Sequence, residues 1–401
     1  MTRTITHLRQ ISDHLTGAKR LVFHPGICEP SLIAHQLVEC VDLWPELIIE
    51  PFMPAAHCPY VGLARLKVET VMPGPHLRQG VATGEVKIIR ETLHEQALSY
   101  ANGKRRADIL VLQVSTPDAQ GNVSLGPSLC AIPQLLDQAA YVFGVINPSL
   151  PKTNAKISLA QINAVLERDV ALPDLPVLLP GNTDRKIAEH VLSILPENCV
   201  VEIGIGTTPD AIMRALVDLE HVKVHAGLIN DALMHLVENG NVAGKVTTTL
   251  AQGSSAFHTW LDGNSKVDFQ PIMRTHDAGV IGKLDRFHAI NGALQVDLEG
   301  NVNAERIAGR IVSCPGGLPD FAKGARLSKG GRNIIVLRST VGNSGQSTIV
   351  DKVDFKTLDG SLVDMVVTEY GIAAISGLNT REKARAISSI ANPNHRIRHN
   401  E

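Results

Sequence analysis

The residues with the clearest chemical potential lie in the last third of the chain, around a Gly-Gly pair. Gly316 and Gly317 follow Ser-Cys-Pro. Such a pair lets the backbone approach a ligand closely and present two N–H groups to an oxyanion or a thioester carbonyl. Cys314, two residues earlier, is a candidate nucleophile if those N–H groups favour its thiolate. A flexible loop and a buried, unreactive thiol are the structural alternatives here.

A second group of candidates surrounds residues 291–303, which read N-G-A-L-Q-V-D-L-E-G-N-V-N. This segment places Gln295 on a predicted strand that ends in a Gly-Asn turn. An amide cannot act as a nucleophile, so its chemistry here would be a hydrogen bond to a carbonyl or an oxyanion. His288, on the approaching strand, is a candidate general base, and a core histidine is the alternative. Glu299 is expected to be a solvated carboxylate of the turn.

A glycine turn near the middle of the chain is a candidate anion site. Gly204 and Gly206 stand between a predicted strand and a helix that starts near Pro209. Backbone N–H groups at such a turn, together with the helix dipole, favour a phosphate. The pattern is a weak dinucleotide fingerprint, because Asp210 occupies the place of the third glycine. A plain tight turn is the alternative.

Composition limits the classes of function that the chain can have. With 401 residues, 44% of them hydrophobic, the chain is long enough for two or three domains. A net charge of -2 provides no basic surface for nucleic acid. The sequence has neither a signal peptide nor a membrane-length apolar run, so we expect a cytoplasmic protein. Six scattered cysteines, and histidines without an H-E-x-x-H spacing, predict neither disulfides nor a metal.

The chain also resembles itself. Residues 22–37 align with 201–216, and 118–124 align with 297–303, both at an offset of 179 residues (297 minus 118). Two independent matches at one offset indicate a duplication.

Prolines at 173, 176 and 180, followed by Gly-Asn-Thr-Asp, predict a linker over residues 171–184. We therefore predict an N-terminal domain over 1–175 and a C-terminal domain over 185–401.

Short apolar runs without alternation predict strands that are buried on both faces. Amphipathic patterns separate these runs and predict helices. The alternation is typical of an α/β fold, here two tandem homologous domains with mainly parallel, helix-covered sheets. Ligand sites in such sheets lie at the carboxyl ends of strands, and often between domains. The strand candidates are 108–114, 141–146 and 333–337, and the helix candidates are 210–219 and 231–238.

Several motifs together resemble the acetyl-CoA hydrolase/transferase family, which includes acetate and 4-hydroxybutyrate CoA-transferases. The resemblance spans roughly residues 105–396 in the same order. The first hundred residues match poorly, apart from Gly26 and Glu29-Pro30. The resemblance implies tandem CoA-transferase domains with the active site between them. The motifs are G-I-G-T-T-P from 204, N-G-A-L-Q-V-D-L-E-G-N-V-N-A-E from 291, G-G-L-P-D-F-A-K-G-A from 316, L-S-K-G-G-R-N-I-I-V-L from 327 and V-V-T-E-Y-G-I-A from 366.

The resemblance implies covalent chemistry in which a glutamate attacks an acyl-CoA thioester and carries CoA as a glutamyl thioester. The family motif N-x-A-[I/L]-E-[V/F]-D places that glutamate at Gln295, whose amide cannot form the intermediate. His225 matches a family histidine, but the Thr-Glu that follows it in the family is Ala226-Gly227 here. Glu369 matches a family glutamate near the site, so we expect it to hydrogen-bond Gln295 or to act as a base.

The resemblance also implies the ligands. Coenzyme A, bound as an acyl-CoA substrate, would lie along Gly316, Gly317, Lys329, Gly342 and Gly345, with Lys329 meeting a phosphate. A surface lysine is the alternative for Lys329. The other expected partners are a small carboxylate or another acyl acceptor, a second copy of the chain in a homo-oligomer, and a carrier-protein or heteromeric partner.

Three functions are consistent with the glutamine. The favoured one is an acyl-CoA-processing enzyme that works on a small acyl thioester by a route other than glutamyl-CoA transfer. That route would be hydrolysis, acyl transfer or carbon-carbon chemistry. The alternatives are an ordinary CoA-transferase carrying a Glu-to-Gln change that traps a complex, and a non-catalytic acyl-CoA-binding subunit. The chain retains the Gly-Gly loop and the V-T-E-Y-G motif, which argues against a protein that has simply lost its function.

Overall fold

The computed structural model describes residues 2–342 and 345–396, and the chain divides into two compact units. Unit 1 groups Met1–Pro176 with Thr247–Arg274, and unit 2 groups Val177–Val246 with Thr275–Glu401. The segment 247–274 is where this division differs from the predicted domains. This segment groups with unit 1 because its backbone forms hydrogen bonds with residues of that unit. For example, the Leu129 N–H donates to the Thr249 carbonyl at 2.9 Å.

Unit 1 contains an eight-stranded sheet in the order β1-β10-β8-β6-β2-β3-β4-β5, and every neighbouring pair runs parallel. β6 and β8 are buried at every residue and, apart from Gln113 of β6, have no strongly polar side chains, as expected for strands covered on both faces. Both strand predictions here are confirmed. The strands are β1 Arg3–Thr4, β2 Arg20–Phe23, β3 Leu47–Glu50, β4 Leu66–Thr70, β5 Val86–Ile88, β6 Ile109–Val114, β8 Tyr141–Ile146 and β10 Ala164–Glu167.

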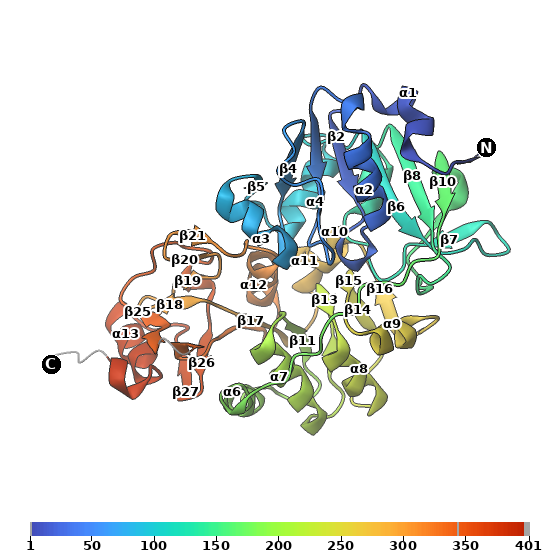
Figure 1. Ribbon diagram of the computed structural model, residues 1–401. Helices are drawn as coiled ribbons and strands as arrows, with labels where there is room; N and C mark the ends of the chain where they lie inside the picture. The colour runs from blue at the N-terminus through green and yellow to red at the C-terminus, as the bar shows by residue number, and fades with distance from the viewer. Residues whose placement is uncertain (1, 343–344, 397–401) are drawn as a thin grey trace. The chain divides into compact units, whose positions relative to one another are not determined.

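Helices cover the unit 1 sheet, and Figure 1 shows α2 beside β2. Leu21 and Phe23 of β2 share one buried apolar cluster with Ile33 and Leu37 of α2. The helices of this unit are α1 Ser12–Leu15, α2 Ser31–Glu39, α3 Gly74–Thr83, α4 Leu93–Ala101, α5 Ile132–Leu136 and α9 Ser255–Leu261. Its shorter strands are β7 Asn122–Ser124, β9 Lys156–Ser158, β15 Leu250–Ala251 and β16 Val267–Phe269.

Unit 2 contains a six-stranded sheet in the order β12-β11-β17-β22-β26-β27. It is parallel except for the β26–β27 pair. The order β26-β22-β17-β11-β12 matches β10-β8-β6-β2-β3 of unit 1, as a repeated chain predicts. The predicted α/β fold with mainly parallel, helix-covered sheets is confirmed. The strands are β11 Val200–Ile203, β12 Lys223–Val224, β17 Phe287–Gly292, β22 Arg332–Val336, β26 Met365–Thr368 and β27 Gly371–Ala374.

The remaining elements of unit 2 lie around this sheet. The predicted helix 231–238 is confirmed, whereas the one predicted over 210–219 begins earlier, at Thr207, and ends at Ala215. No helix in the described ranges is long and apolar enough to cross a membrane. The helices are α6 Asn182–Leu192, α7 Thr207–Ala215, α8 Asp231–Glu238, α11 Ala278–Ile281, α12 Leu318–Leu327 and α13 Thr380–Ser389; α10, Ile272–Thr275, and β14, Val246–Thr248, span the unit boundaries. The short strands are β13 Leu228–Ile229, β18 Gln295–Asp297, β19 Val302–Asn303, β20 Arg306–Ile307, β21 Arg310–Ile311, β23 Thr340–Val341, β24 Gln346–Ser347 and β25 Ile349–Val350.

The two repeated turns have the same local structure. The Asp118 carboxylate accepts from the backbone N–H groups of residues 120 and 122. Asp297 accepts in the same way from residues 299 and 301. Gly121 and Gly300 follow with φ of 75° and 86°, where only glycine avoids strain. The two matching sequence segments thus form the same type of turn, one in each unit.

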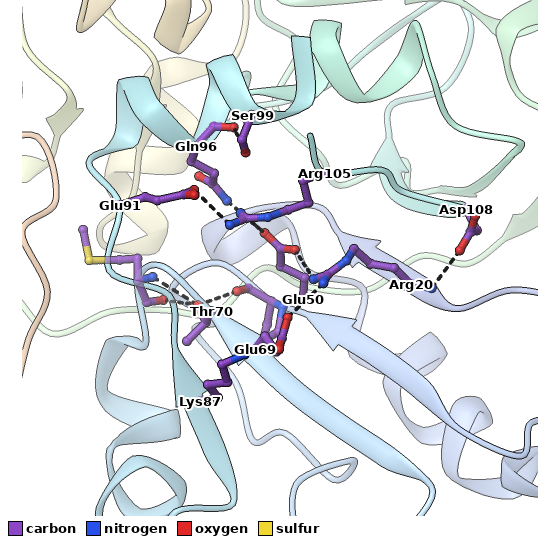
Figure 2. A network of polar contacts seen from close by, with 12 residues as sticks. Arg20, Glu50, Glu69, Thr70, Lys87, Glu91, Gln96, Ser99, Arg105 and Asp108 are labelled. Carbon is purple, nitrogen blue, oxygen red and sulfur yellow. Dashed lines mark hydrogen bonds and ion pairs between the residues drawn. The ribbon is translucent and has the colours of Figure 1, made fainter. Parts of the chain in front are cut away.

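A buried carboxylate organises the polar interior of unit 1 (Figure 2). Glu50, at the end of β3, is 1% exposed. It accepts from Arg20 at 2.6 Å, from Arg105 at 3.1 Å and from Gln96 at 3.2 Å. Arg20 also donates to Glu69, and Arg105 to Glu91. Glu50 therefore ties β2 and β3 to α4 and to the segment before β6.

We predict that Glu50→Gln lowers the free energy of unfolding of unit 1 by about 3 kcal/mol, because it leaves two largely buried guanidinium groups without their shared anion. The measurement is urea unfolding followed by tryptophan fluorescence, since Trp44 and Trp260 both belong to unit 1. Glu46→Gln is the control, because Glu46 pairs with Lys67 on the surface. Equal losses for the two variants would contradict the prediction.

A second buried carboxyl group of unit 1 is incompletely paired. Oε1 of Glu29 accepts from the Tyr60 hydroxyl at 2.8 Å, whereas Oε2 is buried without a hydrogen-bond partner among the described residues. Glu29 lines a cavity of about 50 Å³ with apolar neighbours that include Leu172. Burial raises the pKa of Glu29 to about 8, although the Tyr60 hydrogen bond opposes the rise.

The folded state therefore holds the Glu29 proton more tightly than the unfolded chain, and stability is lost as pH rises from about 4.5 to about 8. We predict that Glu29→Gln gains about 3 kcal/mol over the unsubstituted protein at pH 7, and little at pH 4. Urea unfolding across this pH range measures the difference, with Glu46→Gln again as the control. Parallel pH profiles for Glu29→Gln and the unsubstituted chain would refute the assignment.

Candidate active site

The carboxyl edge of the unit 2 sheet gathers many of the predicted site residues. β11, β17, β22 and β26 run parallel, so the residues that follow each strand emerge at the same edge. Gly204 follows β11, and its N–H donates to the Ile290 carbonyl at 2.9 Å. Gly206, with a φ of 126°, begins α7. Gln295 follows β17, and Glu369 follows β26.

The orientation of the Gln295 amide is fixed by Asn303. The Asn303 Oδ1 accepts from the backbone N–H groups of Glu305 and Arg306, so its Nδ2 must be the donor. That Nδ2 donates to the Gln295 Oε1 at 3.0 Å. The Gln295 side chain therefore keeps its Nε2 group as a hydrogen-bond donor. Among the described residues, no acceptor bonds to that Nε2.

Glu369 lies near Gln295 but is held by a different residue. Its two carboxylate oxygens accept from the Ser339 N–H at 2.9 Å and from the Ser339 hydroxyl at 2.6 Å. Ser339 in turn bonds Thr348, whose carbonyl accepts from Val296, the residue after Gln295. No hydrogen bond joins Glu369 to Gln295 in the part of the chain that the structure describes. One residue of this strand end that sequence reasoning missed is Arg338.

Arg338 follows β22 and donates two hydrogen bonds, at 2.9 and 2.6 Å, to the carboxylate of Asp184. Burial alone would raise the pKa of Asp184, but hydrogen bonds from Arg338 and Thr208 outweigh it and hold the pKa below its usual range. The guanidinium remains partly exposed. It is a cation at the edge where an anionic ligand is expected.

His288 and Lys329 lie at the opposite edge. His288 is the second residue of β17 and pairs with Arg332, the first residue of β22. Four residues of extended strand separate it from Gly292, a span of about 13 Å. Its Nδ1–H donates to the Arg286 carbonyl, and burial lowers its pKa. The Lys329 carbonyl accepts from the Arg286 N–H. Both residues therefore lie away from Gln295, at the other edge of the sheet.

Cys314 is in an environment that disfavours the thiolate. It is 5% exposed, and burial raises the pKa of its thiol to about 12, although a hydrogen bond from the Gly316 backbone opposes the rise. Gly316 has a φ of 57° and Gly317 is the N-cap of α12. The glycine pair therefore ends at a helix N-terminus, where the first backbone N–H groups have no acceptor within the helix.

Gly342 and Gly345 lie between β23 and β24, with φ of 41° and 65°. They flank residues 343–344, which lie outside the described residues. No contact among the residues that the structure describes assigns either glycine to CoA.

A histidine that sequence reasoning missed packs against the Gly-Gly pair. His276 is 1% exposed and lies on the Phe321 ring of α12, with ring centroids 4.6 Å apart. Its Nε2 would be 2.9 Å from a Cβ at Gly227 and 2.7 Å from a Cβ at Gly317. Only glycine at both positions accommodates the imidazole where it lies. No periodic pattern marks His276, since the contact joins three distant segments.

Two further buried polar groups lie on the strands of this edge. Glu202 of β11 accepts from the Asn291 Nδ2 of β17 at 2.6 Å. Burial raises the pKa of Glu202 to about 8, against the effect of that hydrogen bond. A Cβ at Gly204 would lie 2.7 Å from the Asn291 Oδ1, so a larger residue at 204 would have to displace the Asn291 side chain. No cluster of three metal-ligating side chains occurs among the residues described.

Sequence comparisons relate the chain to CoA-dependent enzymes. Residues 253–399 match the acetyl-CoA hydrolase/transferase C-terminal domain. The chain is 29% identical to the 4-hydroxybutyrate coenzyme A transferase of Clostridium kluyveri over 393 residues, covering 94% of this chain and 92% of that protein. It is 28% identical to the acetyl-CoA hydrolase of Kluyveromyces lactis over 239 residues, covering 55% and 45% of the two chains.

Solved structures with the same fold include RipA from Yersinia pestis, with a TM-score of 0.90 at 24% identity, and the 4-hydroxybutyrate CoA-transferase from Porphyromonas gingivalis, with a TM-score of 0.80 at 26% identity. Each match covers 98% of this chain and 95% of the other. The sequence matches and the shared fold agree with the motifs at the carboxyl edge of the unit 2 sheet. Residues 253–399 thus carry the C-terminal domain of the acetyl-CoA hydrolase/transferase family, and the chain is a CoA-transferase/hydrolase-like enzyme that processes acyl-CoA.

Proposed function

We propose that this enzyme cleaves small acyl-CoA thioesters without forming a glutamyl-CoA intermediate. The observation that carries the proposal is the Gln295 amide, which Asn303 holds with its carbonyl oxygen occupied. The resemblance places a glutamate at 227, 295 and 369, and of these three positions only 369 supplies a carboxylate in this chain. The names of relatives, 4-hydroxybutyrate coenzyme A transferase and acetyl-CoA hydrolase, support short acyl groups.

In this proposal Gln295 acts through its Nε2–H group. A thioester carbonyl becomes an oxyanion when it is attacked, and a fixed donor stabilises that charge without having to reorganise. The N–H group of Gly317, the N-cap residue of α12, supplies a further donor. Gly204 and Gly206, at the start of α7, together with Arg338, suit the phosphates of CoA.

The first test is turnover. Acetyl-, propionyl-, butyryl- and 4-hydroxybutyryl-CoA are each incubated with the enzyme, and thiol release and CoA exchange with added acetate are measured separately. We expect turnover of at least one ester. We also expect no inactivation by borohydride in its presence, since no glutamyl thioester forms. Acyl-CoA-dependent inactivation by borohydride would overturn the proposed route, and binding without any turnover would identify a non-catalytic subunit.

The second test concerns Gln295. We predict that Gln295→Ala lowers kcat by about 100-fold, with a smaller change in KM, because it removes a donor that acts on the developing oxyanion. Gln295→Glu should lose the native reaction as well, and in the presence of acyl-CoA its residue 295 should be reduced by borohydride to an alcohol with release of CoA, since the new carboxylate can form the glutamyl thioester. A Gln295→Ala variant with unchanged kcat would exclude the role of the amide. Absence of this reduction in Gln295→Glu would show that the covalent position of the family lies elsewhere.

A further inference from the structure

A cavity of about 500 Å³ lies at the amino edge of the unit 2 sheet. Gly331 and Arg332 line it at the start of β22, and Asp364 lines it directly before β26. Because β27 runs antiparallel to β26, the segment after β27 returns to the same edge and contributes residues 376 and 377. Small-molecule sites have volumes of about 300–1,000 Å³. Unit 2 therefore has a ligand-sized cavity that the proposed reaction does not use.

Three basic side chains line this cavity, and each comes from a different element. Arg326 is in the last turn of α12, Arg332 is the first residue of β22, and Lys383 is the fourth residue of α13. None of the three pairs with a carboxylate among the described residues. Asp364 is the one acidic residue of the lining, and its Oδ2 accepts from the Asn333 N–H at 2.8 Å. The lining therefore has a formal charge of +2 (3 minus 1).

The two guanidinium groups are oriented without being neutralised. The Arg326 Nη1 donates to the Ser361 carbonyl at 2.8 Å, and the Arg332 Nη1 donates to the Gly331 carbonyl at 2.8 Å. A guanidinium has five N–H donors, so each arginine keeps further donors beyond this bond. Phosphate oxygens match such planar donors, because a guanidinium can bind two of them at once.

The helix dipole separates a structural role from a binding role for two of these cations. A cation near the C-terminus of a helix is favoured by the dipole, which gives Arg326 a structural reason to be basic. Lys383 lies near the N-terminus of α13, where the same effect disfavours a cation. A bound anion would offset this cost, whereas the described residues supply Lys383 with no ion pair.

The backbone around the cavity is closely packed. A Cβ at Gly331 would meet the Ala325 carbonyl, and a Cβ at Gly360 would meet the Glu299 carbonyl. Both glycines line the cavity, so its wall at these positions is backbone packed directly on backbone. A ligand would therefore meet a surface that is already formed, which lowers the entropic cost of binding.

We propose that this cavity binds a small molecule with two or more linked phosphate groups, either inorganic diphosphate or a nucleoside diphosphate. Linked phosphates supply several negative charges to a lining of charge +2, and they span cations that come from three separate elements. The site is distinct from the acyl-CoA edge, because β22 carries the chain about 13 Å from Arg332 to Val336. The proposal therefore does not depend on the reaction at that edge.

The experiment is calorimetric titration of the full chain at low ionic strength with diphosphate, ADP and inorganic phosphate, each with and without saturating CoA. We expect diphosphate and ADP to bind with a Kd below about 100 μM, and inorganic phosphate at least about tenfold more weakly, because it makes fewer charge-assisted hydrogen bonds. CoA should leave these affinities unchanged. Tighter binding of ADP than of diphosphate would support a nucleotide as the ligand, and the reverse would support inorganic diphosphate.

The cations are tested in a double variant. Arg332→Gln/Lys383→Gln should weaken the binding of diphosphate and ADP by about tenfold or more, because it removes two cations of the lining. Lys323→Gln/Lys329→Gln is the matched control, since it removes two exposed positive charges of the same unit outside the lining. The control should change either Kd by less than about twofold. The thermal midpoint of each variant confirms that it is folded.

Four results would overturn the proposal. The first is no binding of diphosphate or ADP at about 1 mM, which would show that the cavity has no useful affinity. The second is equal weakening in the two double variants, which would indicate a general effect of charge. The third is displacement of the probes by CoA, which would place them at the acyl-CoA edge. The fourth is inorganic phosphate binding as tightly as diphosphate, which would exclude a requirement for linked phosphates.

Discussion

The parallel hydrogen-bond ladder of β11, β17, β22 and β26 is the constraint on which the candidate site depends. In a parallel sheet every strand ends at the same edge, so the residue that follows each strand faces the residues that follow its neighbours. This is why Gly204, Gln295 and Glu369 belong to one region. The ladder also places His288 and Lys329 at the amino edge, however close to Gln295 or the Gly-Gly pair they lie in the sequence.

The chemistry of this edge is shaped by the cost of burying charge. Burial raises the pKa of Glu202 and of the Cys314 thiol, so both favour their neutral forms. Asp184 remains ionised because Arg338 and Thr208 donate to it. An amide can act in such surroundings without a buried anion. The hydrogen bond between Gln295 and Asn303 gives the Gln295 amide a defined orientation.

Sequence periodicity predicted those helices and strands whose conformation is favoured by their own residues. The strand 141–146 and the helix 231–238 appear as expected, because a continuous apolar run and an amphipathic period each favour one conformation. The segment 247–274 did not follow the domain boundary, because its backbone bonds to unit 1 rather than to its neighbours in sequence. Glu369 was expected to bond Gln295 or to act as a base, and the structure shows both of its carboxylate oxygens accepting from Ser339 on the adjoining strand end.

The sequence by itself determined the α/β class, the family motifs and the lack of a carboxylate at positions 227 and 295, since these follow from residue types and local order. Only the tertiary structure decided which groups meet. His276 stands far from Gly227 and from Gly317 along the chain, yet its ring requires glycine at both. Such a contact depends on how a loop, a strand end and a helix N-terminus pack together, and a local propensity carries no information about that distance.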